Sequence, residues 1–91
     1  MIQMSEIIVH VFSSPTCAPC NHIKPTLNEL QEDYSTFTWK HINISKDPET
    51  ARLFKVTTVP CMIITSGSQI IGSAKGASAM PYFQLLKKAL T

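Results

Sequence analysis

Two cysteines separated by two residues, Cys17 and Cys20, are the side chains of this chain best able to do chemistry. A pair at this spacing can cycle between a dithiol and a disulfide, because one thiolate attacks a disulfide and the other resolves the mixed disulfide. Apolar residues at helical spacing predict a helix that begins near Cys17. The unpaired amides and positive dipole end of such a helix stabilise a thiolate there. The pair is therefore predicted to be a reversible redox centre.

A zinc site is the alternative that the same spacing allows. Zinc normally takes four Cys or His ligands, often supplied as two pairs. The remaining candidates are Cys61, His10, His22 and His41, and the sequence contains no second C-x-x-C and no H-x₃₋₅-H. We therefore expect redox chemistry and no metal, and we expect His10 and His22 to be surface residues.

Length and composition limit the classes of function. The 91 residues predict one domain, 1–91, and 44% hydrophobic with 15% charged residues is ordinary for a globular protein. A net charge of +2 from scattered basic residues favours neither nucleic acid nor a membrane as a partner, and we expect a monomer. The N-terminal residues 1–6 show no targeting pattern, and three cysteines are an odd number, so we expect a reducing, cytoplasmic location.

Hydrophobic periodicity predicts an α/β fold in the order β-α-β-α-β-β-α. Strands are expected over residues 7–12, 37–44, 61–65 and 69–74. The first helix is expected to begin near Cys17, with an apolar stripe of Ile23, Leu27, Leu30 and Tyr34. A short second helix is expected over 48–54. A last helix is expected after an N-cap at Ser78, with a buried stripe of Ala79, Phe83, Leu86 and Leu90. A right-handed first crossover makes the first two strands parallel, which gives a mixed four-stranded sheet with helices on both faces.

Several motifs together resemble the thioredoxin family, from the first strand to the last helix. They are Cys17-Ala18-Pro19-Cys20, Pro25, Ile42-Asn43-Ile44 before Pro48, Thr58-Val59-Pro60 and Lys75-Gly76-Ala77. The chain looks like a thioredoxin that lacks the N-terminal strand and helix usual in the family. Glutaredoxins share this shortening, and Pro15-Thr16-Cys17 is similar to their motif.

The resemblance implies a role for each matching residue. Cys17 is implied to be the attacking cysteine and Cys20 the resolving one, with Pro60 as a cis-proline beside them and Pro25 as a structural helix proline. Apolar surface around the active site would dock substrates, at Pro19, Val59, Pro60, Gly76 and Ala77.

Three positions depart from the family pattern. Thr16 stands where thioredoxins carry a tryptophan, and we expect the sole tryptophan, Trp39, to be a packing residue. Val11 replaces a buried carboxylate, and His41 aligns with the lysine near it. One hypothesis is that His41 takes over proton transfer, because imidazole titrates in the required range. The alternative is a strand histidine with no catalytic role.

Cys61 directly follows Pro60, where thioredoxins usually have a threonine. One interpretation is a small, inert strand residue near the site. The other is a third thiol that forms a dead-end disulfide with Cys17 or Cys20 under oxidative stress.

The leading hypothesis from the resemblance is a protein-disulfide oxidoreductase with no bound cofactor. Electrons would come from NADPH through thioredoxin reductase or a similar flavoenzyme and pass to protein disulfides, with ribonucleotide reductase among the candidate substrates. One alternative is a glutaredoxin-like donor reduced by glutathione, although the segment 70–76 lacks the Gly-Gly-x-Asp pattern of glutaredoxins. Another alternative is a non-enzymatic interaction module, which would need neither thiol.

Overall fold

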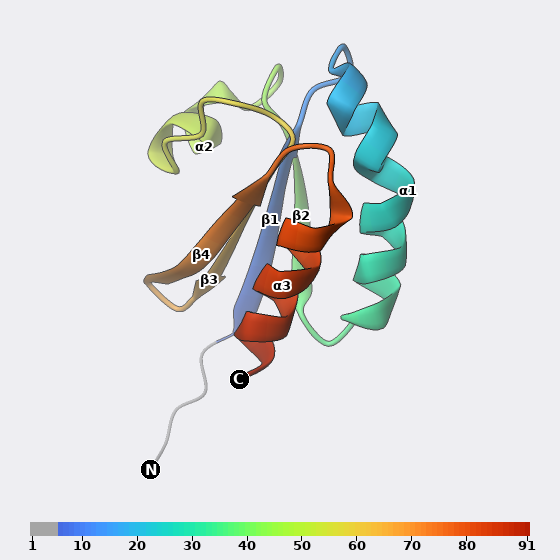
Figure 1. Ribbon diagram of the computed structural model, residues 1–91. Coiled ribbons are helices and arrows are strands. Elements are labelled where there is room, and N and C mark those ends of the chain that lie inside the picture. Colours follow the sequence, from blue (N-terminus) through green and yellow to red (C-terminus); the bar gives the residue numbers. More distant parts are fainter. Residues whose placement is uncertain (1–5) are drawn as a thin grey trace.

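A computed structural model describes residues 6–91 of the chain (Figure 1). The expectation about targeting concerns mainly residues 1–5, which lie outside this range. The described elements follow one another in the predicted order. They are β1 (Ile7–Ser13), α1 (Ala18–Asp33), β2 (Thr38–Asn43), α2 (Pro48–Leu53), β3 (Cys61–Ser66), β4 (Gln69–Lys75) and α3 (Ala79–Leu90).

Within residues 6–91, the strands form one mixed sheet in the order β2-β1-β3-β4. β1 and β2 are parallel, since α1 carries the chain back between them, and β3 is antiparallel to both β1 and β4. Parallel strands end at the same edge of a sheet, so Ser13 and Asn43, the last residues of β1 and β2, are paired there. This edge lies next to the start of α1.

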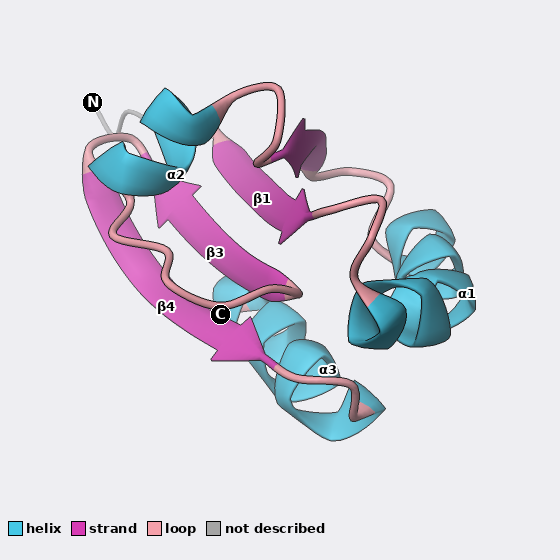
Figure 2. Ribbon diagram, turned by 90° about the horizontal axis from the view of Figure 1, so that it is seen from above, coloured by secondary structure: helices cyan, strands magenta, loops and turns pink. Residues whose placement is uncertain are grey.

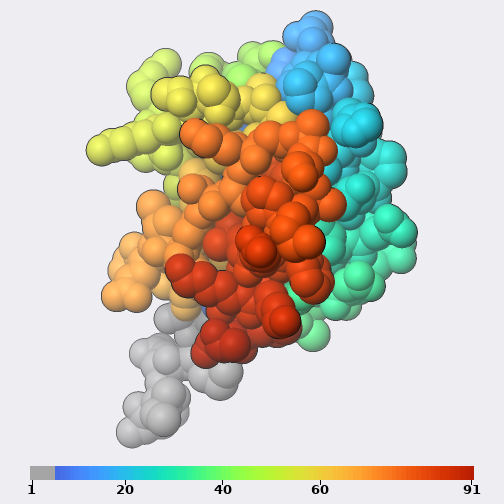
Figure 3. Space-filling view, viewed as in Figure 1, coloured from blue at the N-terminus to red at the C-terminus, as the bar shows by residue number. Residues whose placement is uncertain are grey.

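The helices cover both faces of the sheet, as predicted (Figure 2). α1 and α3 lie on one face and α2 on the other, and Figure 3 shows α3 beside α1 on the outer surface of the first face. Successive strand residues point to opposite faces, so each face has its own apolar cluster. The α1/α3 cluster is built around Val9, Val11, Met62, Ile64 and Leu86, and the α2 cluster contains Phe12, Ala51, Cys61 and Ile63.

α1 is the element that carries both cysteines of the motif to the sheet edge. Cys17 is its N-cap, the helix continues through Pro25, and Ile23, Leu27 and Leu30 are buried as predicted. The C-cap Tyr34 is half-buried and its carbonyl accepts a 3.0 Å hydrogen bond from Trp39 Nε1, which confirms Trp39 as a packing residue. In the described part of the chain, no helix has the length and apolar character needed to cross a membrane.

The predicted buried stripe of α3 is wrong except for Leu86. The helix buries Tyr82, Leu85 and Leu86, whereas Phe83 is 42% and Leu90 60% exposed and Ala79 is also exposed. Tyr82, Leu85, Leu86 and Ala89 stand at positions i, i+3, i+4 and i+7, a helical stripe of their own. Ser78 is the N-cap, but its side chain makes no capping hydrogen bond.

The expectation that His10 is a surface residue is also wrong, whereas His22 is exposed as expected. His10 is 7% exposed, and its Nε2 makes a 3.1 Å hydrogen bond with the hydroxyl of Thr65 on β3. Its ring also packs at 4.7 Å from the Phe54 ring. β1 is a central strand whose two faces are both covered, so even a polar residue on it becomes buried.

Candidate active site

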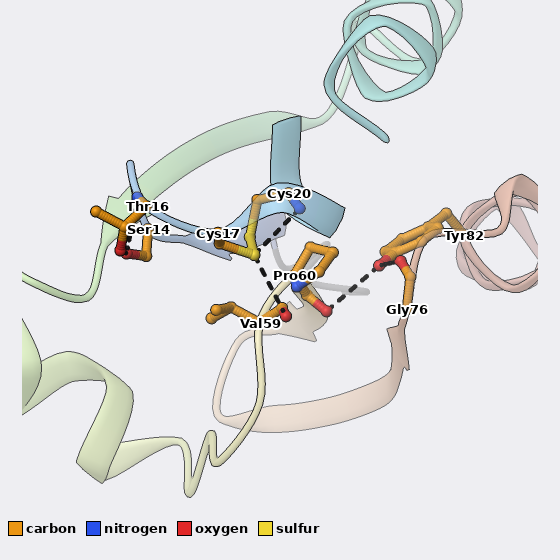
Figure 4. The surroundings of a disulfide bond; sticks show 8 residues. All are labelled: Ser14, Thr16, Cys17, Cys20, Val59, Pro60, Gly76 and Tyr82. Atoms are coloured by element: carbon orange, nitrogen blue, oxygen red, sulfur yellow. Dashed lines mark hydrogen bonds between the residues drawn. A yellow bond between two sulfur atoms is a disulfide. The ribbon is translucent and has the colours of Figure 1, made fainter. Parts of the chain in front are cut away.

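Cys17 and Cys20 form a disulfide at the N-terminal end of α1 (Figure 4). Their Cα atoms are 5.2 Å apart, within the range that a disulfide spans. The helical turn between the two residues sets this separation, so the pair can close and open without rebuilding the helix. The two residues that the sequence singled out are thus in direct covalent contact.

Cys17 Sγ lies where the backbone supplies partial positive charge. The amide N–H of Cys20 donates to Cys17 Sγ across 3.1 Å, in the position of a helix-capping hydrogen bond. The carbonyl oxygen of Val59 lies 3.6 Å from the same sulfur. This is a contact in the disulfide, since neither sulfur then carries a hydrogen, and a reduced Cys17 thiol can donate to it. The amide and the helix dipole favour a thiolate once the disulfide is opened.

The two cysteines differ in their access to solvent. Cys17 is half-buried, whereas Cys20 is 6% exposed and lies against the helix's buried side. Of the two cysteines, Cys17 is therefore the one that another molecule can reach more easily.

A cis peptide bond joins Val59 to Pro60 beside the disulfide, as the motif predicted. Figure 4 shows Pro60 and Val59 directly beneath the two sulfurs. The Pro60 carbonyl accepts a 3.3 Å hydrogen bond from the amide of Gly76, which begins the turn between β4 and α3 with φ of +99°. Two segments distant in sequence, Val59–Pro60 and Gly76–Ala77, are thereby linked next to Cys17.

The five residues expected to dock substrates differ in exposure. Pro19, Gly76 and Ala77 are exposed, Val59 is half-buried and Pro60 is buried. Pro60 therefore offers little surface to a partner, and docking of substrates at the other four residues stays a prediction.

A cavity of about 230 Å³ lies behind Cys20, between α1 and the carboxyl ends of β1 and β2. Cys20, Lys24 and Asn28 line one side at four-residue spacing, and the opposite side includes Val11 and His41, which are paired in register across β1 and β2. Val11 contributes no polar group here. The structure thus brings His41 to the same cavity as the buried cysteine.

His41 is held in a defined orientation at the exposed rim of this cavity. Its Nε2 donates to the side-chain carbonyl of Gln31 across 2.8 Å, which leaves Nδ1 with a free lone pair. Partial burial lowers the pKa of His41, and the positive charge of Lys24 lowers it further. The imidazole is therefore neutral at pH 7 and able to accept a proton.

Cys61 is buried in the α2 cluster, as the first residue of β3. Burial raises the pKa of the Cys61 thiol, against a smaller opposite effect of Lys75. A buried thiol that keeps its proton is a poor nucleophile. This placement favours the inert interpretation over the dead-end disulfide.

Some residues around the site were missed by the sequence analysis. Lys24 and Gln31 carried no motif, although both follow Cys20 on the helix that was predicted. Tyr82 was missed because the stripe of α3 was assigned to the wrong side. Over residues 6–91, no three His, Cys, Asp or Glu side chains gather as a metal site requires.

Comparisons with known proteins agree with this geometry. A family model described as Thioredoxin matches residues 1–89. The chain is 26% identical over 92 residues to Thioredoxin 1 of Chlorobaculum tepidum, which covers 99% of this chain and 89% of that protein. It is 35% identical over 74 residues to a Mycobacterium leprae protein named bifunctional thioredoxin reductase/thioredoxin, covering 76% of this chain and 16% of that one.

A solved structure gives the same result for the fold. The crystal structure of Schistosoma mansoni thioredoxin superposes with a TM-score of 0.85 at 28% identity, covering 92% of this chain and 77% of that one. The chain spans only 14%, 16% and 35% of the length of three curated relatives that it matches. With its C-x-x-C disulfide at the start of α1, its cis-proline and its mixed sheet, this chain belongs to the thioredoxin family.

Proposed function

We propose that this protein is a thiol–disulfide oxidoreductase that reduces protein disulfides by exchange through Cys17 and Cys20. The observation that carries the proposal is the position of the Cys17 sulfur. It caps α1, accepts the Cys20 amide hydrogen bond and belongs to the more exposed of the two cysteines. An accessible, backbone-stabilised thiolate is what nucleophilic attack on a disulfide requires.

The reaction proceeds by two exchanges. The Cys17 thiolate attacks one sulfur of the substrate disulfide, that S–S bond breaks, and the other substrate sulfur leaves as a thiolate. The Cys20 thiolate then attacks the Cys17 sulfur of the mixed disulfide and releases the second substrate thiolate. The substrate gains two electrons and takes up two protons, and Cys17–Cys20 becomes the disulfide of the structure.

Cys20 must lose its proton before the second exchange, and the cavity behind it offers the route. His41 has a free Nδ1 lone pair at the cavity's rim, and water in a cavity of about 230 Å³ can connect it to Cys20. We therefore assign His41 to proton transfer through water. Among the described residues that line the cavity there is no carboxylate, and His41 and Lys24 are the titratable side chains apart from Cys20.

The surface around the disulfide suits an extended polypeptide. Val59 and Gly76 come from two different segments and lie beside Cys17 (Figure 4), and Pro19 and Ala77 are their small or apolar neighbours in the chain. Backbone groups of an extended chain can pair with such a loop, as happens when a peptide adds to a sheet edge. Protein disulfides are therefore the proposed substrates, with that of ribonucleotide reductase among the candidates.

NADPH, acting through a flavoenzyme such as thioredoxin reductase, is the proposed source of electrons. The name of the Mycobacterium leprae relative joins a thioredoxin reductase to a thioredoxin, which supports such a partner. The protein itself would bind no cofactor, and a cytoplasmic location would keep the pair reduced.

The test equilibrates the oxidised protein with NADPH and thioredoxin reductase, and separately with glutathione, NADPH and glutathione reductase. Alkylation and mass spectrometry then report each cysteine. Reduction of Cys17–Cys20 by the flavoenzyme is expected. Reduction by glutathione alone would support the glutaredoxin-like alternative, and no reduction by either system would overturn the proposal in favour of an interaction module.

A further inference from the structure

Tyr82 places a hydroxyl group at the junction of the two loops beside the disulfide. The side chain is fully buried, and its ring belongs to the α1/α3 cluster. Its hydroxyl donates to the carbonyl of Gly76 across 2.5 Å and lies 3.4 Å from the carbonyl of Pro60 (Figure 4). A phenylalanine or leucine could fill the same apolar space, so the hydroxyl has a separate role.

The two carbonyls belong to the segments that form the proposed docking surface. Pro60 follows Val59, whose carbonyl lies against Cys17 Sγ, and Gly76 precedes the exposed Ala77. The Gly76 amide already donates to the Pro60 carbonyl across 3.3 Å. With the Tyr82 hydroxyl, both backbone polar groups of Gly76 are hydrogen-bonded. Gly76 has a φ of +99°, and no atom lies within 4 Å of where a Cβ would stand, so side-chain packing at that position does not hold the turn.

The hydroxyl remains a donor at every pH at which the protein would work. Burial raises the pKa of Tyr82 to about 12, with a smaller contribution from Cys61. A buried hydroxyl left without an acceptor is destabilising, so it stays with the two carbonyls.

We propose that the Tyr82 hydroxyl is a positioning group for polypeptide substrates, holding the Val59–Pro60 and Gly76–Ala77 segments as one docking surface beside Cys17. This inference rests on the proposed disulfide reductase function. Tyr82 does not touch the reacting sulfurs, so the chemistry of Cys17 itself does not depend on it. Binding of an extended protein substrate does, because such a chain contacts both segments at once.

The test compares Tyr82→Phe, which removes one oxygen and keeps the ring, with wild type. Insulin serves as the protein substrate, with dithiothreitol returning Cys17–Cys20 to the dithiol after each turnover. The small disulfide is 5,5′-dithiobis(2-nitrobenzoate), which is mixed with the reduced protein alone. The KM for insulin is expected to rise about three- to tenfold, the effect of one hydrogen bond, with kcat unchanged. The small-disulfide rate and the reduction potential of Cys17–Cys20 are expected to stay within about twofold of wild type.

Tyr34→Phe is the matched control. It makes the same chemical change at the other tyrosine, at the C-terminal end of α1 and far along the helix from the cysteines. This variant should leave the ratio of insulin to small-disulfide reduction at the wild-type value.

Hydrogen exchange of the Gly76 amide gives a second measurement. Its protection should fall at least about threefold in Tyr82→Phe and be unchanged in Tyr34→Phe. If Tyr82→Phe does not fold, the Tyr82 hydroxyl proton of the wild-type protein is examined by NMR. Slow exchange and a contact with Gly76 are then expected, and a rapidly exchanging proton overturns the proposal.

Other outcomes also overturn it. Equal losses for insulin and the small disulfide would place the effect on the cysteines and not on docking. If the ratio of insulin to small-disulfide reduction and the protection of the Gly76 amide are both unchanged in Tyr82→Phe, the hydroxyl is a buried, hydrogen-bonded group with no role in docking. Failure of the wild-type protein to reduce either substrate would contradict the proposed function itself, which distinguishes the two failures.

Discussion

The two cysteines of the disulfide differ in what surrounds them, and this difference fits the roles proposed for them. Cys17 is half-buried at the helix cap, where the Cys20 amide and the helix dipole favour a thiolate once the disulfide is opened. Cys20 faces a cavity whose titratable neighbours are Lys24 and His41. The first environment suits attack, and the second suits a thiol that must be deprotonated only after attack.

The proton-transfer role proposed for His41 predicts a change in the pH profile of disulfide reduction. The lowered pKa of His41 keeps the imidazole neutral at pH 7 and protonates it only below its ordinary value of 6.5, so the resolving step should slow there. In His41→Ala this dependence should disappear and the rate at pH 7 should fall about tenfold, below the roughly 10²–10⁴-fold of a direct base. Stopped-flow reduction of insulin measures both.

His22→Ala is the control for this experiment, since His22 is an exposed histidine on the same helix that does not line the cavity. It should retain the wild-type profile. A His41→Ala profile that matches wild type would make His41 a structural residue.

The burial of Cys61 predicts that it resists modification. When the reduced, folded protein is treated with iodoacetamide, Cys17 should be alkylated first and Cys61 only after denaturation, because a buried protonated thiol is unreactive. Peptide mass spectrometry reads each site. Alkylation of Cys61 at the rate of Cys17, or a Cys61 disulfide after peroxide treatment, would restore the dead-end hypothesis.

At the scale of elements, α3 packs against the sheet with a different side from the one that the sequence periodicity predicted. The helix lies over β4 so closely that a Cβ on Gly72 would meet Leu85 Cδ1 at 2.8 Å. Leu85 and Leu86 face the sheet, and Phe83 faces outward despite being aromatic. This orientation also aims Tyr82 at the loops beside the disulfide.

A matched pair of truncations tests this orientation. Leu86→Ala should lower the free energy of unfolding by about 2–5 kcal/mol, the usual cost of emptying a fully buried leucine site. Phe83→Ala should cost less than about 1 kcal/mol, because its side chain is 42% exposed. Urea denaturation measures the free energy of unfolding of both variants. A larger loss of this free energy in Phe83→Ala than in Leu86→Ala would contradict the orientation.

Sequence reasoning predicted the elements because each has a strong local signal. The apolar run of β1, the Ile23-Leu27-Leu30 stripe and the Cys17-Ala18-Pro19-Cys20 motif need no tertiary information. α3 contains two overlapping apolar stripes, so only packing against β4 could choose between them. The cavity behind Cys20 and the Tyr82 contacts join residues distant in the chain, and His10 is buried only because β1 is a central strand.

The whole molecule should lose stability in mild acid through its histidines. Burial lowers the pKa of His10, with a further effect from Lys40, and the pKa of His41 is also lowered. As the pH falls from about 6.5 toward the folded-state pKa, the unfolded chain binds protons that the folded chain does not. Stability is therefore fully present above this window and declines as the pH drops through it.

Urea denaturation at pH 7.5 and at pH 5.5 measures this decline. His10→Asn should be less stable than wild type at pH 7.5, because it loses the Phe54 contact, but its stability should depend less on pH. His22→Asn should show the wild-type dependence. If the stability of His10→Asn depends on pH as strongly as that of wild type, His10 is not the cause of the decline in acid.

Trapping of a mixed disulfide tests the central claim most directly, namely that Cys17 attacks and Cys20 resolves. Reduced Cys20→Ser and reduced Cys17→Ser are each mixed with insulin, quenched with acid and weighed by mass spectrometry. The account predicts a stable insulin adduct on Cys17 in the Cys20→Ser variant and none in Cys17→Ser. An adduct on Cys20 in the Cys17→Ser variant, or no adduct in either, would contradict it.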